Sequence, residues 1–213
     1  MSRERPAKKR SAAAASRDAS ILKAALQEFT HHGFAATRME DIARRAGVAK
    51  GTIYLRFKDK EALFEAIVRK EISPLVMAAG APLQPGEPVR TFLERSLTPL
   101  VESSGRARRV AIIRLVIAEA PRFPKLGELY FRDVVEPGLQ AFRRLARQAY
   151  DNGELADTAA IKYPQLLLAP AIVGLLWSAL FDRFEPLDIP AMMHAHFDHF
   201  FPAKTMTSQP DRR

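Results

Sequence analysis

Residues 37–60 read TRMEDIARRAGVAKGTIYLRFKDK, and this stretch decides how the rest of the chain is interpreted. Ile42, Val48 and Ile53 are spaced so that they can form a small core between two short helices. Gly47 lies between these helices, where a sharp turn needs a residue that tolerates positive φ. The stretch therefore predicts a helix, a tight turn and a second helix.

The second helix, expected over about residues 50–57, carries cationic and hydroxyl side chains. Ile53 and Phe57 are four residues apart and face inward. The N-terminal residues of such a helix suit the DNA major groove, where they meet base edges. The candidate DNA contacts on and after its other faces are Lys50, Gly51, Thr52, Tyr54, Leu55, Arg56 and Lys58.

Each of these side chains has a definite chemistry toward DNA. Lys50 reaches a phosphate or a guanine edge, Thr52 a phosphate or a thymine methyl, and the Tyr54 hydroxyl a phosphate. Gly51 permits close approach of the backbone. Lys60 begins the next helix, whose terminal N–H groups also favour a phosphate. A hairpin that merely packs is the alternative, but the core spacing, the turn glycine and the basic decoration together favour DNA binding.

The charge distribution agrees with this interpretation. Residues 1–60 contain 14 Lys and Arg against 6 Asp and Glu, a net charge of +8, whereas residues 61–213 are nearly balanced at +1. A positive field on the N-terminal quarter is expected if that part meets a polyanion, although a solubilising surface is the alternative. The chain has no cysteine, which excludes disulfides and Cys-ligated zinc.

The regions beside this stretch also carry local signals. We expect residues 1–15 to be a flexible basic arm that either touches DNA phosphates or has no specific role. A first helix is expected over about Ser16–His32, ended by Gly33. Thr37 is a candidate N-cap of the next helix, with Glu40 as its capping-box partner.

Helical periodicity continues through the rest of the chain, and no strand pair is evident. Asp59 is expected to cap a helix that ends before the Pro-rich loop 81–88. The predicted fold class is all-α, with about nine helices. The expected parts are the arm 1–15, a DNA-binding domain with linking helix 16–78, a dimerisation and effector-binding domain 88–201, and a disordered tail 202–213.

The segment GFAATRMEDIARRAGVAKGTIYLRFKDKEALFEAIV closely resembles the DNA-binding domain of the TetR family of bacterial transcriptional regulators. The resemblance covers about residues 17–72. It implies three helices that bind DNA and a fourth that links them to a larger helical domain, which dimerises and binds a small effector. The implied DNA contacts are Thr37, Arg38, Lys50, Gly51, Thr52, Tyr54, Arg56 and Lys60. Many members have an aromatic residue near Leu55 and Arg56, so the resemblance implies that contact there shifts to Arg56.

The segment RLVIAEAPRFPKLGELYFRDVVEP resembles, in outline, a subgroup of the family's C-terminal domains related to efflux-pump repressors. In the family, the last two long helices form a four-helix bundle across a two-fold axis. We therefore expect a homodimer through about residues 126–151 and 158–184, with a buried monomer core as the alternative.

The effector site is less clearly marked in the sequence. Arg114 lies in the apolar run AIIRLVIAE, where a charge needs a partner or an exit to solvent. We expect the Arg114 guanidinium to meet an acidic ligand, an internal partner or water. Tyr130, Phe142, Trp177 and Phe181 either line an apolar pocket or belong to the ordinary core.

Other function classes find little support. His194, His196 and His199 suggest a metal, but no nearby ligand completes a site, so a surface or interface helix is favoured. We expect no cofactor, no metal and no catalytic residue, because no nucleophile elbow, paired-carboxylate site or phosphate loop is present. We expect no membrane association, because the longest apolar run, Leu166–Phe181, is shorter than the ~18–20 residues of a membrane span.

The sequence thus predicts a cytoplasmic, ligand-responsive repressor that binds a pseudo-palindromic DNA operator as a dimer and responds to a small-molecule effector. A transcriptional activator or an architectural DNA-binding protein of the same fold is the alternative.

Overall fold

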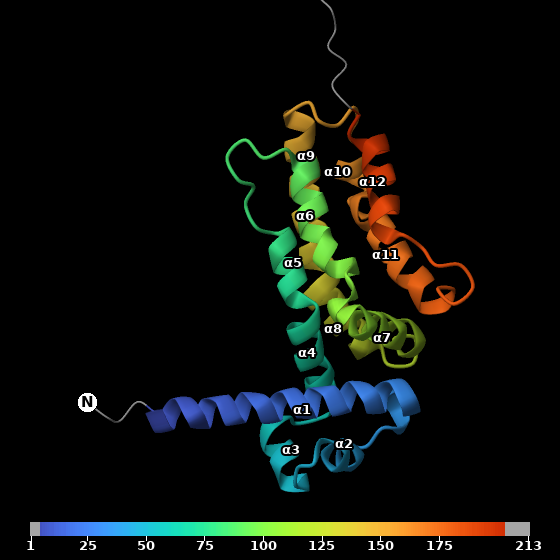
Figure 1. Cartoon of the computed structure of the whole chain (residues 1–213). Coiled ribbons are helices and arrows are strands. Elements are labelled where there is room, and N and C mark those ends of the chain that lie inside the picture. Colours follow the sequence, from blue (N-terminus) through green and yellow to red (C-terminus); the bar gives the residue numbers. More distant parts are fainter. Residues whose placement is uncertain (1–4, 203–213) are drawn as a thin grey trace, which may run out of the picture. The chain divides into compact units, whose positions relative to one another are not determined.

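The structure, a computed structural model, describes residues 5–202, and every regular element in that range is helical (Figure 1). The predicted all-α class is confirmed. The elements are α1 to α12 with one π-helical segment, η1, so they are more finely divided than the nine helices expected. Residues 1–4 of the predicted arm and residues 203–213 of the predicted tail lie outside the described range.

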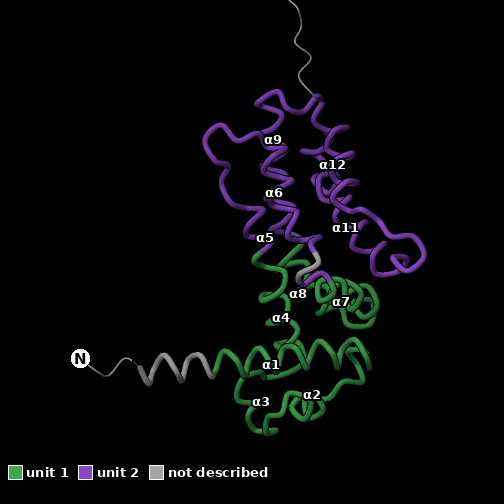
Figure 2. Tube along the Cα trace, viewed as in Figure 1, with its two compact units in different colours: residues 1–74, 107–135 green, residues 75–106, 136–213 purple. Residues whose placement is uncertain are grey.

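The chain divides into two compact units that are not continuous in sequence (Figure 2). The first contains residues 1–74 and 107–135, and the second contains residues 75–106 and 136–213. This grouping differs from the linear division expected between about 78 and 88. The difference arises because residues 107–135 pack with the N-terminal helices: α8 (Pro124–Tyr130) contacts α4 (Lys60–Glu71), and the ring of Phe123 lies 5.5 Å from that of Phe34.

The first unit is built around a helix-turn-helix. Its N-terminal elements are α1 (Arg5–Ala36), α2 (Met39–Ala46), α3 (Lys50–Arg56) and α4 (Lys60–Glu71). Both α2 and α4 contact α1, and α3 contacts α2. The apolar stripes of these helices meet in one core, because the fully buried side chains include Ile21, Phe29, Ile42, Ile53 and Phe64.

The first helix is longer than expected. It begins at Arg5, so residues 5–15, which we expected to be a flexible arm, are helical in the structure. Alanines occupy positions 12–15 and have the highest helix propensity, which explains why the helix can continue through them. The expected stop at Gly33 is a break, where φ is 79° and ψ is 162°, and helical geometry resumes briefly as far as Ala36.

Two helices expected to be continuous are broken, and a third, over 158–184, is interrupted at Pro164 as expected but continues through Pro170. The linking helix expected over 60–78 is divided at Ile72 into α4 and α5 (Ser73–Ala79). The helix expected over 126–151 consists of α8 (Pro124–Tyr130), η1 (Phe131–Val135) and α9 (Glu136–Asp151). Pro164 separates α10 (Ala159–Lys162) from α11 (Gln165–Leu180), because proline lacks the N–H that would continue the helical hydrogen-bond pattern.

The second unit is a helical bundle. Its α6 (Val89–Val101) contacts α9, α11 and α12 (Ile189–Phe200). Gly174 of α11 permits the closest approach, since a Cβ atom there would lie 2.5 Å from Cγ2 of Ile189 on α12. This small residue therefore serves packing within the chain. The remaining helix, α7 (Ser103–Glu119), carries residues 107–119 into the first unit.

Candidate nucleic-acid interface

The turn between α2 and α3 is built as the sequence predicts. Gly47 is left-handed, with φ 68° and ψ 30°, and its N–H donates to the carbonyls of Ala43 and Arg44. The N–H of Val48 donates to the Ala43 carbonyl at 3.0 Å. These bonds satisfy the last carbonyls of α2 and turn the chain sharply into α3. Any side chain at position 47 would be strained by the positive φ.

The inward faces of the two helices hold α3 in place. Ile42 of α2 and Ile53 of α3 are fully buried, and Ala43 is small enough for the helices to cross closely. After α3, Asp59 caps α4 as predicted, because its Oδ1 accepts from the N–H of Ala62 at 2.8 Å. α3 is therefore held by its buried face on one side and by the capped helix α4 that follows it.

The outward face of α3 is exposed. Lys50, Gly51, Arg56 and Lys58 are open to solvent, and Thr52 is half-buried. Two large side chains with apolar surface are also exposed: Tyr54 is 45% exposed and Leu55 is 87% exposed. A short helix that presents cations, a hydroxyl, a glycine and two exposed apolar side chains has the chemistry of a DNA-reading surface.

A carboxylate that was not considered as a site residue organises this face. Glu40 Oε1 of α2 lies 2.8 Å from Nζ of Lys50 and accepts from the Tyr54 hydroxyl at 3.2 Å. The hydrogen bond from Lys50 lowers the pKa of Glu40 to about 2, and the same pair raises the pKa of Lys50. Glu40 therefore holds two candidate DNA contacts in fixed positions beside each other.

A second pairing involves α1. Nε of Arg56 lies 3.4 Å from Oδ1 of Asp18, so the last residue of α3 is tied to the first helix. The sequence assigns no role to Asp18 and only that of a capping-box partner to Glu40, because both ion pairs join residues of different helices. Ion pairs are predicted from sequence by spacings of three or four residues on one helix, and these two pairs do not have that spacing.

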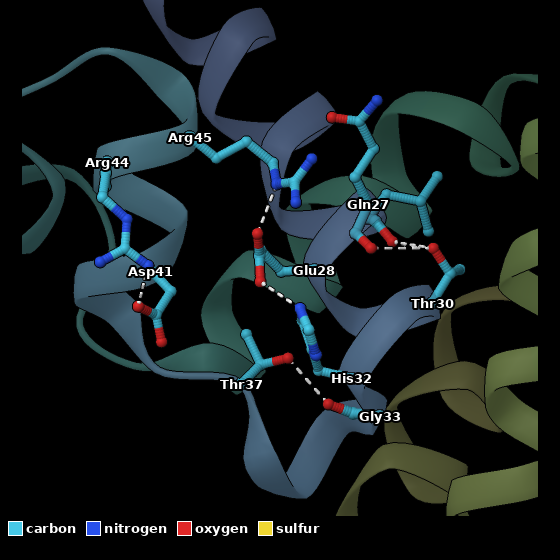
Figure 3. A network of polar contacts seen from close by, with 10 residues as sticks. Gln27, Glu28, Thr30, His32, Gly33, Thr37, Asp41, Arg44 and Arg45 are labelled. Atoms are coloured by element: carbon cyan, nitrogen blue, oxygen red, sulfur yellow. Dashed lines mark hydrogen bonds and ion pairs between the residues drawn. The ribbon is translucent and has the colours of Figure 1, made fainter.

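The back of α2 is fastened to α1 by a polar network (Figure 3). Glu28 is 6% exposed, and its carboxylate accepts from Nε of Arg45 and lies 3.6 Å from Nε2 of His32. Arg44 pairs with Asp41 of its own helix at 2.6 Å. A buried carboxylate is costly unless it is paired and hydrogen-bonded, so Glu28 and Arg45 depend on each other to keep α2 in register with α1.

Two predicted DNA contacts have hydrogen-bond partners within the protein. Thr37 is 3% exposed, and its hydroxyl donates to the Gly33 carbonyl at 2.8 Å. The predicted capping box is therefore wrong, because Arg38 occupies the N-cap position and no side chain caps α2. Lys60 donates to the carbonyls of Phe34 and Ala35 at 2.6 and 2.8 Å, and its partial burial lowers its pKa. Both side chains hold the connection between α1 and α2, whereas Arg38 is exposed.

The five candidate effector residues are distributed over both units. Arg114 and Tyr130 belong to the first, where Arg114 is exposed and burial raises the pKa of Tyr130 to about 12. In the second unit, Phe142 is buried in the core. Trp177 and Phe181 contact each other with ring centroids 5.1 Å apart, and the indole N–H donates to the Glu185 carbonyl.

The histidines of α12 have protein partners. His194 lies 3.1 Å from Glu94, and Nε2 of His196 lies 2.8 Å from the Leu166 carbonyl. The part of the chain that the structure describes contains no group of three metal-ligating side chains. Among residues 5–202, no helix is both long enough and apolar enough to cross a bilayer.

Two family models match the chain. Residues 21–67 match the model described as bacterial regulatory proteins, tetR family, and residues 91–185 match that of the AefR-like transcriptional repressor, C-terminal domain. The first match contains the whole helix-turn-helix. The second begins within α6 and ends after α11.

Curated relatives support the same assignment. The uncharacterised HTH-type transcriptional regulator YhgD of Bacillus subtilis (strain 168) is 38% identical over 82 residues, which is 38% of this chain and 43% of that protein. The chain thus spans less than half the length of that relative. The HTH-type transcriptional repressor BepR of Brucella suis biovar 1 (strain 1330) is 30% identical over 165 residues, covering 74% of this chain and 77% of BepR.

A solved structure is similar over most of both chains. SmeT, the repressor of the Stenotrophomonas maltophilia multidrug efflux pump SmeDEF, matches with a TM-score of 0.62 and 26% identity. The match covers 85% of this chain and 87% of SmeT. The likeness therefore extends through both the helix-turn-helix and the bundle that follows it in sequence.

Proposed function

The chain belongs to the TetR family of bacterial regulatory proteins, and from this premise we propose that it is a DNA-binding transcriptional repressor. One observation carries the proposal. The outward face of α3 presents Lys50, Tyr54 and Arg56 to solvent beside Gly51, while Ile53 on the opposite face is fully buried. A packed inner face and a cationic outer face are what a recognition helix requires.

The contacts divide by their chemistry. Lys50 and Thr52 lie in the first turn of α3, where we assign them to base edges or nearby phosphates. Tyr54, Arg56 and Lys58 supply phosphate contacts, with Arg38 at the start of α2. Leu55 offers an apolar surface to a thymine methyl. We assign Thr37 and Lys60 to positioning, because their polar atoms bind backbone carbonyls.

The protein acts as a homodimer in this proposal. Apolar residues lie on all sides of α11, yet its outer side and the residues just after it remain uncovered, as shown by Val173, Leu180 and Phe184, the last of which is 70% exposed. An exposed apolar surface of this kind marks a protein interface. The exposed face of α9 carries three arginines, so within the expected segments 126–151 and 158–184 we assign the main contact to the second. A dimer would place two recognition helices ~34–36 Å apart on a pseudo-palindrome.

Regulation by a small molecule completes the proposal. An effector that binds one conformation of the dimer more tightly than another shifts its affinity for DNA by linkage. We place the protein in the cytoplasm, where bacterial DNA is found, and assign it no catalytic activity.

A gel-shift titration with the DNA upstream of the protein's own gene tests DNA binding. We expect a specific complex that survives moderate salt and weakens as salt rises, because phosphate contacts release counterions. Tyr54→Ala should weaken binding to all sequences, whereas Thr52→Val should change the preference among them. Absence of any specific complex at moderate salt would contradict the proposed function.

Sedimentation equilibrium tests the dimer. Phe184→Glu places a charge on the proposed interface and should convert dimer to monomer, because an unpaired charge is costly to bury. Arg183→Glu, at the neighbouring position, is a matched control that adds the same side chain beside the apolar surface. Equal dissociation of both variants, or none in either, would move the interface elsewhere.

A further inference from the structure

A cavity of about 330 Å³ lies inside the first unit, between α1 and α7. Phe29, Thr30 and Gly33 of α1 form one wall, and α7 forms the other with apolar side chains that include Val110 and Leu115. This volume lies at the lower end of the range for small-molecule sites, ~300–1,000 Å³. The cavity is separate from the candidate effector residues of the second unit.

Glu119 lines this cavity with an incompletely bonded carboxylate. Its Oε1 accepts from the N–H of Phe34 at 3.2 Å. Its Oε2 is shielded from solvent and has no hydrogen-bond partner among the described residues. Carboxylate oxygens that are buried normally have donors. The last torsion of a glutamate is broad, so a small rotation can present the unpartnered oxygen to the cavity.

Arg114 supplies the opposite charge from the same cavity lining. It lines the cavity and is exposed, and its guanidinium makes no hydrogen bond or ion pair within the described part of the chain. It precedes Glu119 by five residues, which corresponds to ~7.5 Å along the helix axis and ~140° around it, so a ligand that meets both charges must extend along the cavity. Val110 and Leu115 provide apolar surface beside these two charges.

We propose that this cavity binds a small amphoteric molecule. An ammonium group of the ligand donates to Glu119, a carboxylate accepts from the Arg114 guanidinium, and a short hydrocarbon chain packs against Val110 and Leu115. Each charged end forms a charge-assisted hydrogen bond, and the arginine fork suits a carboxylate. A molecule with only one of the two charges leaves either Glu119 or Arg114 unpaired.

Phe34 connects this cavity to the proposed DNA-binding helices, so ligand binding can affect them. The N–H of Phe34 binds Glu119, its carbonyl binds Lys60, and its ring lies 5.5 Å from that of Phe123. A ligand ammonium that competes for Glu119 loosens this junction, which connects α1 to α2. The ligand therefore lowers DNA affinity, and this regulatory part rests on the proposed function, whereas the binding part does not.

Isothermal titration calorimetry of the full chain tests binding directly. The probe is 6-aminohexanoate, whose two charges are separated by a five-carbon chain, with hexanoate and hexylamine as single-charge controls. We expect saturable binding of one 6-aminohexanoate per chain, and about tenfold or weaker affinity for each control because one charge-assisted hydrogen bond is lost. No saturable binding, or equal binding of hexylamine, would overturn the proposal.

Three variants assign the binding to the site. Glu119→Gln keeps an acceptor for the Phe34 N–H but removes the charge, and Arg114→Met removes the guanidinium from an exposed position. Each should weaken 6-aminohexanoate binding about tenfold, whereas Arg122→Met, an exposed arginine outside the cavity, should leave it unchanged. Thermal melting verifies that each variant is folded. Wild-type affinity in Glu119→Gln and Arg114→Met would overturn the assignment.

A gel shift with saturating 6-aminohexanoate then tests regulation. Weaker DNA binding supports the regulatory part, and unchanged DNA binding refutes it while the calorimetric result still stands. If the protein binds no DNA at all, the proposed function fails and the ligand site is judged by calorimetry alone.

Discussion

The outward faces of α3 and α9 both carry cations, but only those of α3 are held by carboxylates. Lys50 pairs with Glu40 and Arg56 with Asp18, whereas Arg143, Arg144 and Arg147 of α9 have no ion pair in the described part of the chain. Paired cations lose rotamer freedom before DNA arrives, so less entropy is lost on binding. Positive charge alone therefore does not identify the DNA-binding surface. The proposed DNA-binding face of α3 differs from α9 in its paired cations and in its exposed apolar side chains Tyr54 and Leu55.

Removal of the buried side chain that supports α3 should have the largest effect. Ile53→Ala deletes a fully buried side chain and should destabilise the first unit by about 2–5 kcal/mol, with loss of DNA binding. Leu55→Ala, on the exposed side of the same helix, should change stability by less than about 0.5 kcal/mol. Urea unfolding monitored by circular dichroism measures both. Similar stability of the two variants would show that α3 is not anchored by Ile53.

Removing one cation from each helix tests whether the face of α3 or general positive charge determines DNA affinity. Lys50→Ala should weaken operator binding about tenfold, because it removes a contact to a base edge or phosphate. Arg143→Ala removes the same charge from α9 and should leave the affinity unchanged. Gel-shift titrations at one salt concentration give both values. An equal loss in both variants would indicate that general electrostatic attraction, rather than the face of α3, determines binding.

Residues 37–60 could be predicted well because their signals are local. Gly47 needs positive φ at the turn, Ile42 and Ile53 have helical spacing, and Asp59 caps the next helix. Each of these signals depends on residues within a few positions. The confirmed features of the helix-turn-helix are those for which the neighbouring sequence is sufficient.

The features that escaped prediction depend on long-range partners. Thr37 suited a capping box, but the Gly33 carbonyl is its partner, and Lys60 binds carbonyls 25 or 26 residues earlier in the chain. Glu40 received no role as a site residue, because its link to Tyr54 spans 14 residues. The grouping of 107–135 with the N-terminal helices likewise follows from packing between distant segments.

Freeing the cations of α3 should sharpen the contrast with α9. Glu40→Gln removes the carboxylate that competes with DNA phosphates for Lys50 and Tyr54, so non-specific DNA affinity should rise about two- to fivefold. Glu128→Gln removes one negative charge from α8, where the Glu128 side chain makes no hydrogen bond or ion pair among the described residues. Fluorescence anisotropy with random-sequence DNA measures both. A matching increase in Glu128→Gln would assign the effect to net charge alone.

The smallest effect concerns the titration of Glu40 itself. Its pKa is lowered from 4.5 to about 2, first by the hydrogen bond from Lys50, so the stabilisation from this pair is complete above about pH 4.5 and is lost as the pH falls toward 2. Carboxyl carbon shifts followed by NMR should give a midpoint near 2 in the wild type and a higher one in Lys50→Ala. Arg143→Ala should leave the midpoint unchanged, because the α9 cations hold no carboxylate of α2. A midpoint near 4.5 in the wild type would mean that Glu40 does not hold Lys50 in solution, and α3 and α9 would then present their cations in the same unpaired state.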